Sequence, residues 1–427
     1  MKNAVYVIIL NFLIIFSASA QNNRIDGLRP DAPELAKPGI YKIGVRTLNL
    51  KHNNQIDAVN LKEGEELSIY VRPITVEVWY PADTNRTSGE YKNVLLRDAK
   101  TKVSLYGKAV RDARPLIAEN PYPLVVISHG YPGNRFLMSH FGENLASKGY
   151  VVVSIDHTDS MYQDAGAFVS TLLNRPLDQK FVLTEMKRMN TNTSHFLYKM
   201  VDTNNAGLMG YSMGGYGALI SAGGGITKQA AENPDVSPNQ ILKRVMAGTY
   251  AHKDMMFTDT YKAIIAFAPW GMGSGFWDDQ SLSDISIPIF FITGSEDQTS
   301  GYETGTKALF EKTENINRYL LTFANANHNA IAPIPAPDEA WTAKFNDGKS
   351  LAYTHYTDMV WDSVRANNIA QHFVTAYFGK MLKGNNSMDD YLGVTPNSND
   401  GTGDTNWKGF KPRSAKGLKL EYLAKED

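Results

Sequence analysis

The sequence predicts an α/β fold with a mostly parallel sheet of eight strands, flanked by helices and interrupted by insertions. Two observations lead to this fold class. From residue 123 to residue 323, short continuous apolar runs alternate with segments of helical periodicity. That pattern is typical of strand–helix–strand units in a parallel sheet that is buried on both faces. One of the apolar runs also leads through a Gly-rich turn, residues 210–214, into a helix of small residues.

The expected strands are, in chain order, residues 39–50, 68–80, 123–128, 150–155, 206–209, 263–268, 287–293 and 318–323. The first two alternate apolar and polar residues, so we expect them to be antiparallel, and Pro81 should end the second. Residues 84–121 are mixed and charged, and should form a surface excursion. Pro176 should open one helix, and Gly384 should follow the end of a long helix over residues 358–382.

The composition is that of a globular protein that can bury a full core. Of 427 residues, 43% are hydrophobic and 20% are charged. The net charge is −1, and Lys and Arg are spread along the chain, which argues against a nucleic-acid partner. The chain has no cysteine, so disulfides, thiolate metal sites and a cysteine nucleophile are excluded.

The first 20 residues have the pattern of a signal peptide. Lys2 carries the only charge, residues 5–16 are apolar, and Ala18 and Ala20 occupy the −3 and −1 positions of a cleavage site. The apolar run is short for a membrane span, although an uncleaved anchor is the alternative. We therefore expect a secreted or periplasmic protein without a stable membrane anchor after cleavage.

We expect one catalytic domain between a lead-in and a tail. The predicted segments are a signal peptide at 1–20, a lead-in at 21–38, an α/β domain at 39–384 and a C-terminal tail at 385–427. Two insertions interrupt the domain, at 222–261 and 331–358, and are candidate lids over a site at the sheet edge. The tail is rich in Asn, Asp and Gly before a candidate strand at 418–423.

The Gly-rich turn predicts a catalytic nucleophile. Its sequence, Gly210-Tyr-Ser212-Met-Gly214, fits the pattern G-x-S-x-G of a strand–turn–helix nucleophile elbow. The flanking glycines let the strand and the helix approach each other without Cβ clashes. The elbow should expose the Ser212 hydroxyl and direct the backbone N–H of Met213 at a developing oxyanion. The alternative is a Gly-rich turn with an incidental serine.

A serine nucleophile needs a base that is itself held by an acid. Asp297 follows the strand at 287–293, and His328 follows the strand at 318–323. Both should therefore lie at the sheet edge where Ser212 emerges, in the order Ser, acid, His. Glu296 is the main competitor for the acid. Two later histidines fall in an insertion and inside the long helix, where packed or solvated histidines are expected.

The oxyanion hole needs a second donor from the loop after the strand at 123–128. Gly130 permits close approach there, and the Tyr131 N–H is the natural donor. We interpret His129 as a structural loop residue, with a second base as the alternative. The polar residues 156–159 after the next strand are interpreted as loop hydrogen bonding rather than metal ligation. No metal and no organic cofactor are expected.

Together these motifs resemble the cutinase and polyester-hydrolase branch of the α/β hydrolases. The motifs are Ser128-His-Gly-Tyr131, Gly210-Tyr-Ser-Met-Gly-Gly215, Ala268-Pro-Trp270, Gly294-Ser-Glu-Asp297 and Asn327-His328. The stretch at 128–159 also resembles platelet-activating-factor acetylhydrolases and the predicted dienelactone hydrolases. The resemblance covers residues 76–382. It implies the α/β-hydrolase fold, the triad Ser212, Asp297 and His328, and backbone oxyanion donors at Tyr131 and Met213.

The resemblance also bears on the substrate. In polyester hydrolases the matching aromatic residues flank the bound ester, which implies substrate contacts for Tyr131 and Trp270. Core packing is the alternative for Trp270. This sequence departs from dienelactone hydrolases, which use a cysteine, and from the platelet-activating-factor enzymes, whose acid follows an earlier strand. The long insertion at 222–261 also differs from the open site of a cutinase.

We expect an exported serine esterase, a carboxylic-ester hydrolase that forms an acyl-enzyme on Ser212. Its substrates would be small-molecule or lipid esters, with short- to medium-chain or aromatic esters foremost. The alternatives are a phospholipase A2-like lipid esterase related to platelet-activating-factor acetylhydrolase, and a polyester hydrolase or cutinase. A peptidase and a non-catalytic binding protein on the same fold remain further alternatives.

Overall fold

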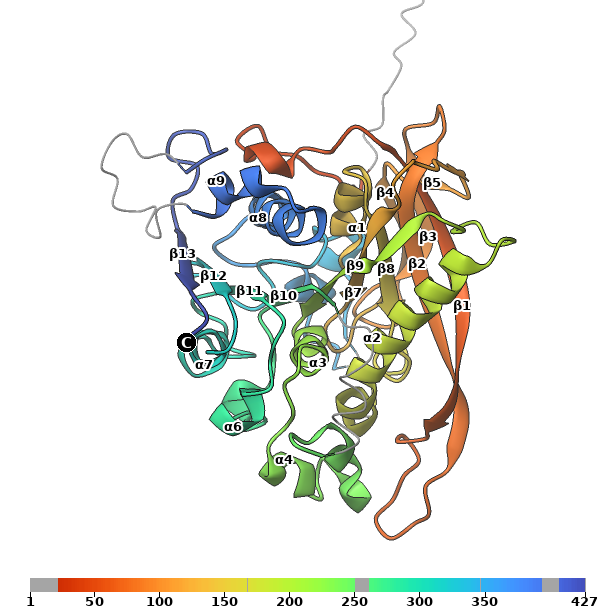
Figure 1. Ribbon diagram of the computed structural model, residues 1–427, viewed down its shortest axis with the longest axis vertical. Coiled ribbons are helices and arrows are strands. Elements are labelled where there is room, and N and C mark those ends of the chain that lie inside the picture. Colours follow the sequence, from red (N-terminus) through yellow and green to blue (C-terminus); the bar gives the residue numbers. More distant parts are fainter. Residues whose placement is uncertain (1–21, 167, 250–260, 346, 394–406, 427) are drawn as a thin grey trace, which may run out of the picture.

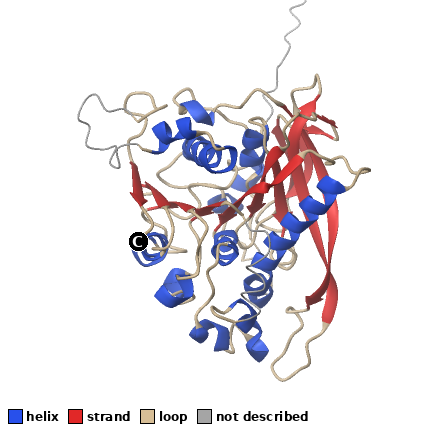
Figure 2. Ribbon diagram, viewed as in Figure 1, coloured by secondary structure: helices blue, strands red, loops and turns tan. Residues whose placement is uncertain are grey.

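A mostly parallel sheet forms the middle layer of the molecule, and helices cover both of its faces (Figure 1, Figure 2). The computed structural model describes residues 22–166, 168–249, 261–345, 347–393 and 407–426. Within these residues the main sheet has eleven strands, in the order β13-β12-β11-β10-β9-β7-β8-β2-β1-β5, with β6 paired to β2. A separate two-stranded sheet contains β3 and β4. The predicted α/β fold class is confirmed.

The strands are β1 Lys42–Ile56, β2 Ile69–Asp83, β3 Gly89–Leu95, β4 Lys102–Gly107, β5 Val110–Arg111, β6 Arg114–Pro115, β7 Tyr122–Ser128, β8 Val151–Asp156, β9 Val201–Tyr211, β10 Ala263–Phe267, β11 Ile289–Gly294, β12 Arg318–Phe323 and β13 Leu418–Leu423. The α-helices are α1 Ser139–Ala146, α2 Phe168–Thr191, α3 Met213–Ser221, α4 Lys228–Glu232, α6 Asp279–Leu282, α7 Ala308–Lys312, α8 Ser363–Lys383 and α9 Asp389–Leu392. None of the helices within the described ranges combines the length and apolarity that a membrane crossing requires.

The six central strands, β7 to β12, are parallel to one another. Their side chains are almost all buried because α1 and α8 cover one face and α2 and α3 cover the other. Burial on both faces explains why these strands appear in the sequence as continuous apolar runs. All six were predicted, with ends displaced by a few residues.

The first two strands are antiparallel, as predicted, and β2 also pairs antiparallel with β8. However, β2 does not end at Pro81. It continues to Asp83, and Pro81 lies opposite Ile43 of β1. A proline fits there because the pairing of β2 with β8 stops at Trp79, so the missing N–H leaves no ladder bond unmade.

The expectation of a surface excursion over residues 84–121 is wrong for residues 89–115, because β3 and β4 form a second sheet and β5 and β6 join the main sheet. Strands β3 and β4 form an antiparallel hairpin whose apolar face packs into the core beside α1. Tyr91 links the hairpin to β2 and to α1. Its hydroxyl accepts a hydrogen bond from Nε1 of Trp79 in β2 (2.7 Å) and donates one to Glu143 of α1 (2.6 Å). The alternation of apolar and polar residues was masked by the charges on the exposed face of the hairpin.

Helix α2 begins at Phe168, and the prediction that Pro176 opens it is wrong. Pro176 lies inside the helix, where it cannot donate to the carbonyl of Leu172, four residues earlier. The hydroxyl of Tyr216 in α3 donates to that carbonyl instead, at 3.2 Å. A tertiary contact therefore replaces the lost helical hydrogen bond.

Helix α8 begins at Ser363, five residues later than predicted, and ends before Gly384 as predicted. The later start arises because Asp358 accepts the N–H groups of Val360 and Trp361 in a turn, at 2.8 Å each, and Asp362 then caps the helix. Gly384 has a φ of 63° and terminates it.

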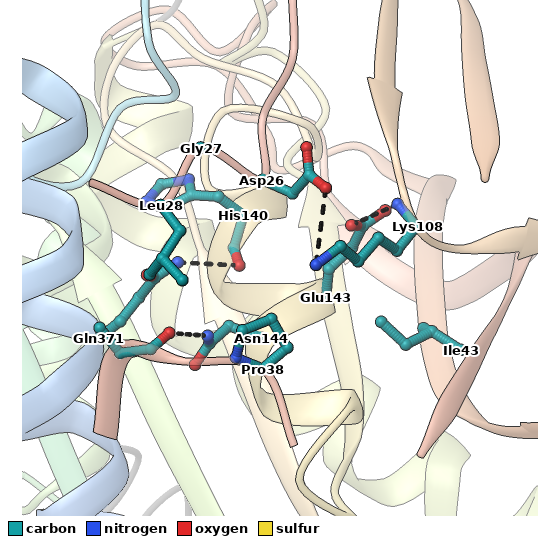
Figure 3. Close-up of a pocket in the computed structure, with 11 residues that line it drawn as sticks. Asp26, Gly27, Leu28, Pro38, Ile43, Lys108, His140, Glu143, Asn144 and Gln371 are labelled. Atoms are coloured by element: carbon teal, nitrogen blue, oxygen red, sulfur yellow. Dashed lines mark hydrogen bonds and ion pairs between the residues drawn. The ribbon is translucent and has the colours of Figure 1, made fainter. Parts of the chain in front are cut away.

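Both chain-end segments pack on this framework. The predicted strand at 418–423 is confirmed as β13, which pairs antiparallel with β12. The lead-in lies against α1 and α8, and Figure 3 shows the small pocket that they enclose, with His140, Asn144 and Gln371 in its wall.

The predicted signal peptide lies outside the described residues. So do residues 250–260 of the first insertion, whose assignment as a lid stays a prediction.

Candidate active site

Ser212 occupies the sharp turn between β9 and α3. It has a φ of 53° and a ψ of −112°, which a non-glycine residue rarely adopts. Its N–H donates to the carbonyl of Phe267 in β10 at 2.9 Å, and its carbonyl accepts the N–H of Tyr216 at 3.0 Å. These two hydrogen bonds hold the strained turn in place. The side chain is 7% exposed.

The flanking glycines permit the close approach of three chain segments. A Cβ atom on Gly210 would lie 2.2 Å from the carbonyl oxygen of Gly214. A Cβ atom on Gly214 would lie 2.0 Å from the carbonyl oxygen of Ser128, at the end of β7. Only glycine fits at either position, so the elbow and the end of β7 are packed backbone against backbone.

Asp297 and His328 lie on the loops after the neighbouring parallel strands β11 and β12, and their side chains meet. Nδ1 of His328 is 2.9 Å from Oδ2 of Asp297. Oδ1 of Asp297 accepts the N–H groups of Thr299 and Ser300, at 2.8 Å each. With its Nδ1 proton directed at the carboxylate, the ring presents Nε2 as an acceptor. Glu296, the competing acid, is exposed.

Tyr211 connects the nucleophile turn to the histidine loop. Its ring centroid lies 5.2 Å from that of His328. Its hydroxyl donates to Oδ1 of Asn329 (2.6 Å) and to the carbonyl of His328 (3.3 Å). Burial, and secondarily the charge of Asp297, raises the pKa of Tyr211 well above its ordinary value, which keeps the donor protonated. The residue next to Ser212 thus holds the loop that carries His328.

The loop after β7 lies against the same turn. A Cβ atom on Gly130 would be 3.4 Å from Cβ of Ser212, so Gly130 and the following Tyr131 border the nucleophile. Met213 is the first residue of α3, and its N–H therefore has no acceptor within the helix. Tyr131 and Met213 are thus close neighbours of the turn at Ser212, and their role as oxyanion donors stays a prediction.

His129 is fully buried, and its ring meets that of His157 edge to face at 5.1 Å. Its Nδ1 donates to the carbonyl of Gly130 at 2.6 Å, and its Nε2 accepts the N–H of His157 at 3.3 Å. Burial lowers the pKa of His129 well below its ordinary value. Both ring nitrogens are engaged with the backbone, which matches the structural role that we expected.

A second Ser-His-Asp chain lies beneath the site. Oγ of Ser128 is 2.8 Å from Nε2 of His157, and Nδ1 of His157 is 3.0 Å from Oδ2 of Asp178. Arg72 pairs with the same carboxylate at 3.0 Å. All four side chains are at most 1% exposed, so no ester can reach Ser128. Burial, followed by the charge of Arg175, lowers the pKa of His157 to about 3.

The polar residues 156–159 are thus used in structural contacts. Asp156 pairs with Arg135, and Asp159 pairs with Arg72 at 2.7 Å. Across the described ranges, no group of three His, Asp or Glu side chains is arranged to hold a metal ion.

An aromatic row extends from the elbow. The rings of Tyr131 and Phe168 meet edge to face at 5.6 Å, and those of Phe168 and Trp270 at 5.4 Å. The backbone N–H of Trp270 donates to the carbonyl of Ser212 at 3.1 Å, which anchors the aromatic row beside the nucleophile. Trp270 also packs on Phe276 at 5.0 Å, so it contacts the core as well. Phe168 was missed from the sequence because α2 was expected to begin eight residues later.

Comparison with known proteins supports one family. Residues 101–239, which include Tyr131 and Ser212, match the protein-family model described as "PET hydrolase-like" (PETase). The chain contains a PET hydrolase-like α/β-hydrolase domain. This agrees with the resemblance to the cutinase and polyester-hydrolase branch that the motifs indicate.

The PET hydrolase-like domain is distantly homologous to cutinases of Thermobifida over about half of the chain. The similarity to "Cutinase est1" of Thermobifida alba is 25% identity over 244 residues, which is 56% of this chain and 64% of the relative. "Cutinase 1" of Thermobifida cellulosilytica is 24% identical over 250 residues, 56% of this chain and 73% of the relative. A cutinase of Thermobifida fusca (strain YX) is 24% identical over 250 residues, 56% of this chain and 64% of the relative. The chain thus spans less than two thirds of the first and third of these relatives.

Proposed function

We propose that this protein is a serine carboxylic-ester hydrolase with Ser212 as its nucleophile. The observation that carries the proposal is the meeting of three loops at the carboxyl edge of the sheet. These are the strained turn at Ser212, the loop with the hydrogen-bonded pair His328 and Asp297, and the loop at Gly130. The similarity to cutinases and PET hydrolase-like proteins supports the same reaction class.

The proposed reaction proceeds through an acyl-enzyme. His328 accepts the proton of Ser212 at Nε2 while Oγ attacks the ester carbonyl. The N–H groups of Tyr131 and Met213 stabilise the oxyanion, and His328 returns the proton to the leaving alcohol. Water, deprotonated by His328, then attacks the acyl carbon, the bond to Oγ of Ser212 breaks, and His328 returns the proton to Oγ as the acid leaves. Asp297 orients the imidazole and stabilises its charged form, and no cofactor takes part in these steps.

The substrate class that we propose is short- to medium-chain or aromatic esters. The row of Tyr131, Phe168 and Trp270 offers an apolar surface beside Ser212 for the acyl or alcohol group. A polyester hydrolase or cutinase is the second candidate, favoured by the printed names of the matching family and relatives. Release of soluble acid from a polyester film, against hydrolysis of p-nitrophenyl esters, distinguishes the two.

The two Ser-His-Asp chains offer a matched test of the nucleophile. A fluorophosphonate probe should label the wild-type protein and Ser128→Ala, but not Ser212→Ala. Hydrolysis of p-nitrophenyl acetate by Ser212→Ala should fall by at least about 10³-fold, since the triad acts as a unit. Normal turnover by Ser212→Ala, or labelling that depends on Ser128, would refute the assignment.

We also propose that the protein is exported, on the pattern of residues 1–20. N-terminal sequencing of the mature protein should then begin at Gln21. A mature chain that retains residues 1–20 would contradict cleavage and favour the anchor.

A further inference from the structure

Arg175 is a buried cation that contacts the loop bordering the nucleophile. It projects from α2 and is 1% exposed. Its guanidinium donates to the carbonyl of His129, to the carbonyl of Gly130 at 2.9 Å and to Oγ of Ser160 at 2.7 Å. Nε has no hydrogen-bond partner within the described chain. Hence all of these hydrogen bonds end on neutral oxygens, two of them in the loop after β7.

The contact with Gly130 has a consequence for the next residue. The carbonyl of Gly130 and the N–H of Tyr131 belong to one planar peptide unit, and in a trans peptide they point in opposite directions. The only cis bond near this loop in the described chain is the following one, Tyr131–Pro132. A donor that fixes the carbonyl therefore fixes the direction of the N–H.

We propose that Arg175 is a positioning residue of the oxyanion hole, acting together with Nδ1 of His129, which donates to the same Gly130 carbonyl. It holds the Gly130–Tyr131 peptide so that the Tyr131 N–H faces the reacting carbonyl, and its charge polarises that N–H toward the oxyanion. Hydrogen bonds in series strengthen one another by polarisation in a low-dielectric interior. This inference rests on the proposed function and adds a residue that never touches the substrate.

The surroundings suit such a role. Ser160, which orients one end of the guanidinium, is itself held by Thr171 at 2.9 Å. Burial lowers the pKa of Arg175 to about 9, although the charge of Asp178 opposes this effect. The side chain therefore remains a cation at neutral pH. A buried cation that forms no direct ion pair is costly, and here its hydrogen bonds hold the backbone of one loop.

The test compares Arg175→Gln and Arg175→Lys with Arg188→Gln in the full-length protein. Arg188 lies on the same helix, is 61% exposed and forms an ion pair with the half-buried Glu185, which makes it a matched control. With p-nitrophenyl acetate, kcat of Arg175→Gln should fall about 10- to 100-fold with KM changed less than about threefold. This is less than the 10²- to 10³-fold loss on removing an oxyanion donor, because the donor remains but is misplaced. Arg188→Gln should match the wild type.

A second readout isolates the oxyanion. The Ser212 hydroxyl adds to the carbonyl of a trifluoromethyl ketone, and the oxygen of the resulting hemiketal occupies the oxyanion hole. The inhibition constant of the ketone should rise in Arg175→Gln by the same factor as kcat/KM falls, because both report one interaction. If Arg175 only supported the fold, the change in the inhibition constant would not need to match the change in turnover.

The outcomes separate this inference from the proposed function. If Ser212→Ala remains active, the proposed function fails. If Ser212 is the nucleophile but folded Arg175→Gln retains its kcat and its ketone affinity, only the role of Arg175 fails. Arg175→Lys keeps a cation in the site, so it should retain the fold and recover part of kcat. Loss of the thermal transition in both variants would overturn the proposal in favour of a structural role.

Discussion

Nδ1 of His328 lies 2.9 Å from Oδ2 of Asp297, and the other carboxylate oxygen is held by two backbone N–H groups. Asp297→Asn would preserve the shape of this contact but present an amide to the ring and favour the wrong tautomer. We expect kcat for p-nitrophenyl acetate to fall roughly 10³- to 10⁴-fold with little change in thermal stability. Glu296→Gln is the neighbouring control and should retain full activity. Similar losses in both variants would contradict the assignment of the acid.

The aromatic row predicts a difference between substrates. Phe168 contacts both Tyr131 and Trp270, so Phe168→Ala should open a gap in the surface beside Ser212. We expect KM for p-nitrophenyl benzoate to rise about 5- to 30-fold, the equivalent of about 1–2 kcal/mol of lost aromatic contact. KM for p-nitrophenyl acetate should change less than about twofold. Equal changes for both esters would indicate that Phe168 only supports the fold.

Because the nucleophile elbow is packed backbone against backbone, a single added methyl group should lower the stability of the fold. Gly214→Ala would place a Cβ atom 2.0 Å from the carbonyl of Ser128, where only backbone movement can relieve the clash. We expect this variant to lose several degrees of Tm and most of its activity. Gly166→Ala, whose Cβ would meet nothing within 4 Å, is the control and should match the wild type. An unaltered Tm in Gly214→Ala would exclude the tight packing of β7 against the elbow.

Acid should destabilise the fold through its buried histidines. Burial lowers the pKa of His140, in the wall of the pocket in Figure 3, from 6.5 to about 3. The unfolded chain therefore binds a proton between these values that the native chain does not. The stability from the neutral ring is fully present above about pH 6.5 and is lost as the pH falls toward 3.

The measurement is urea unfolding at pH 7 and at pH 5. His140 should lower the free energy of unfolding by about 2 kcal/mol between these pH values. In His140→Leu the difference between the two pH values should shrink by about that amount, whatever the effect of the substitution at pH 7. An equal pH difference in the variant and the wild type would show that His140 does not remain neutral.

The central strands and the pairing of Asp297 with His328 could be predicted from the sequence, for physical reasons. Strands buried on both faces must be apolar throughout, and the loops after parallel strands emerge at one edge. The order of the motifs therefore placed these residues at the same edge. The structure pairs His328 with Asp297, and Tyr211 links their loop to the turn at Ser212. The triad itself stays a prediction.

Features that depend on tertiary contacts could not be predicted. Pro176 stays inside α2 because Tyr216 of another helix satisfies the carbonyl of Leu172. The misplaced start of α2 then hid Phe168. Arg175 carries no motif, and the carbonyl of Gly130 to which it donates is 45 positions away in the chain. Such residues become visible only when distant segments are packed.

The pairing of β13 with β12 has a consequence for the order in which the molecule is made. Strand β12, which leads to His328, lies between β11 and β13, and Arg318 at its start donates to the carbonyl of Ala424, 106 positions further on. A chain that leaves the ribosome, or a translocation channel, presents Ser212 long before β13 is available. Until then β12 is an open sheet edge. The histidine loop is therefore among the last parts of the sheet to be secured, and a newly made chain should gain activity only when its final strand has docked.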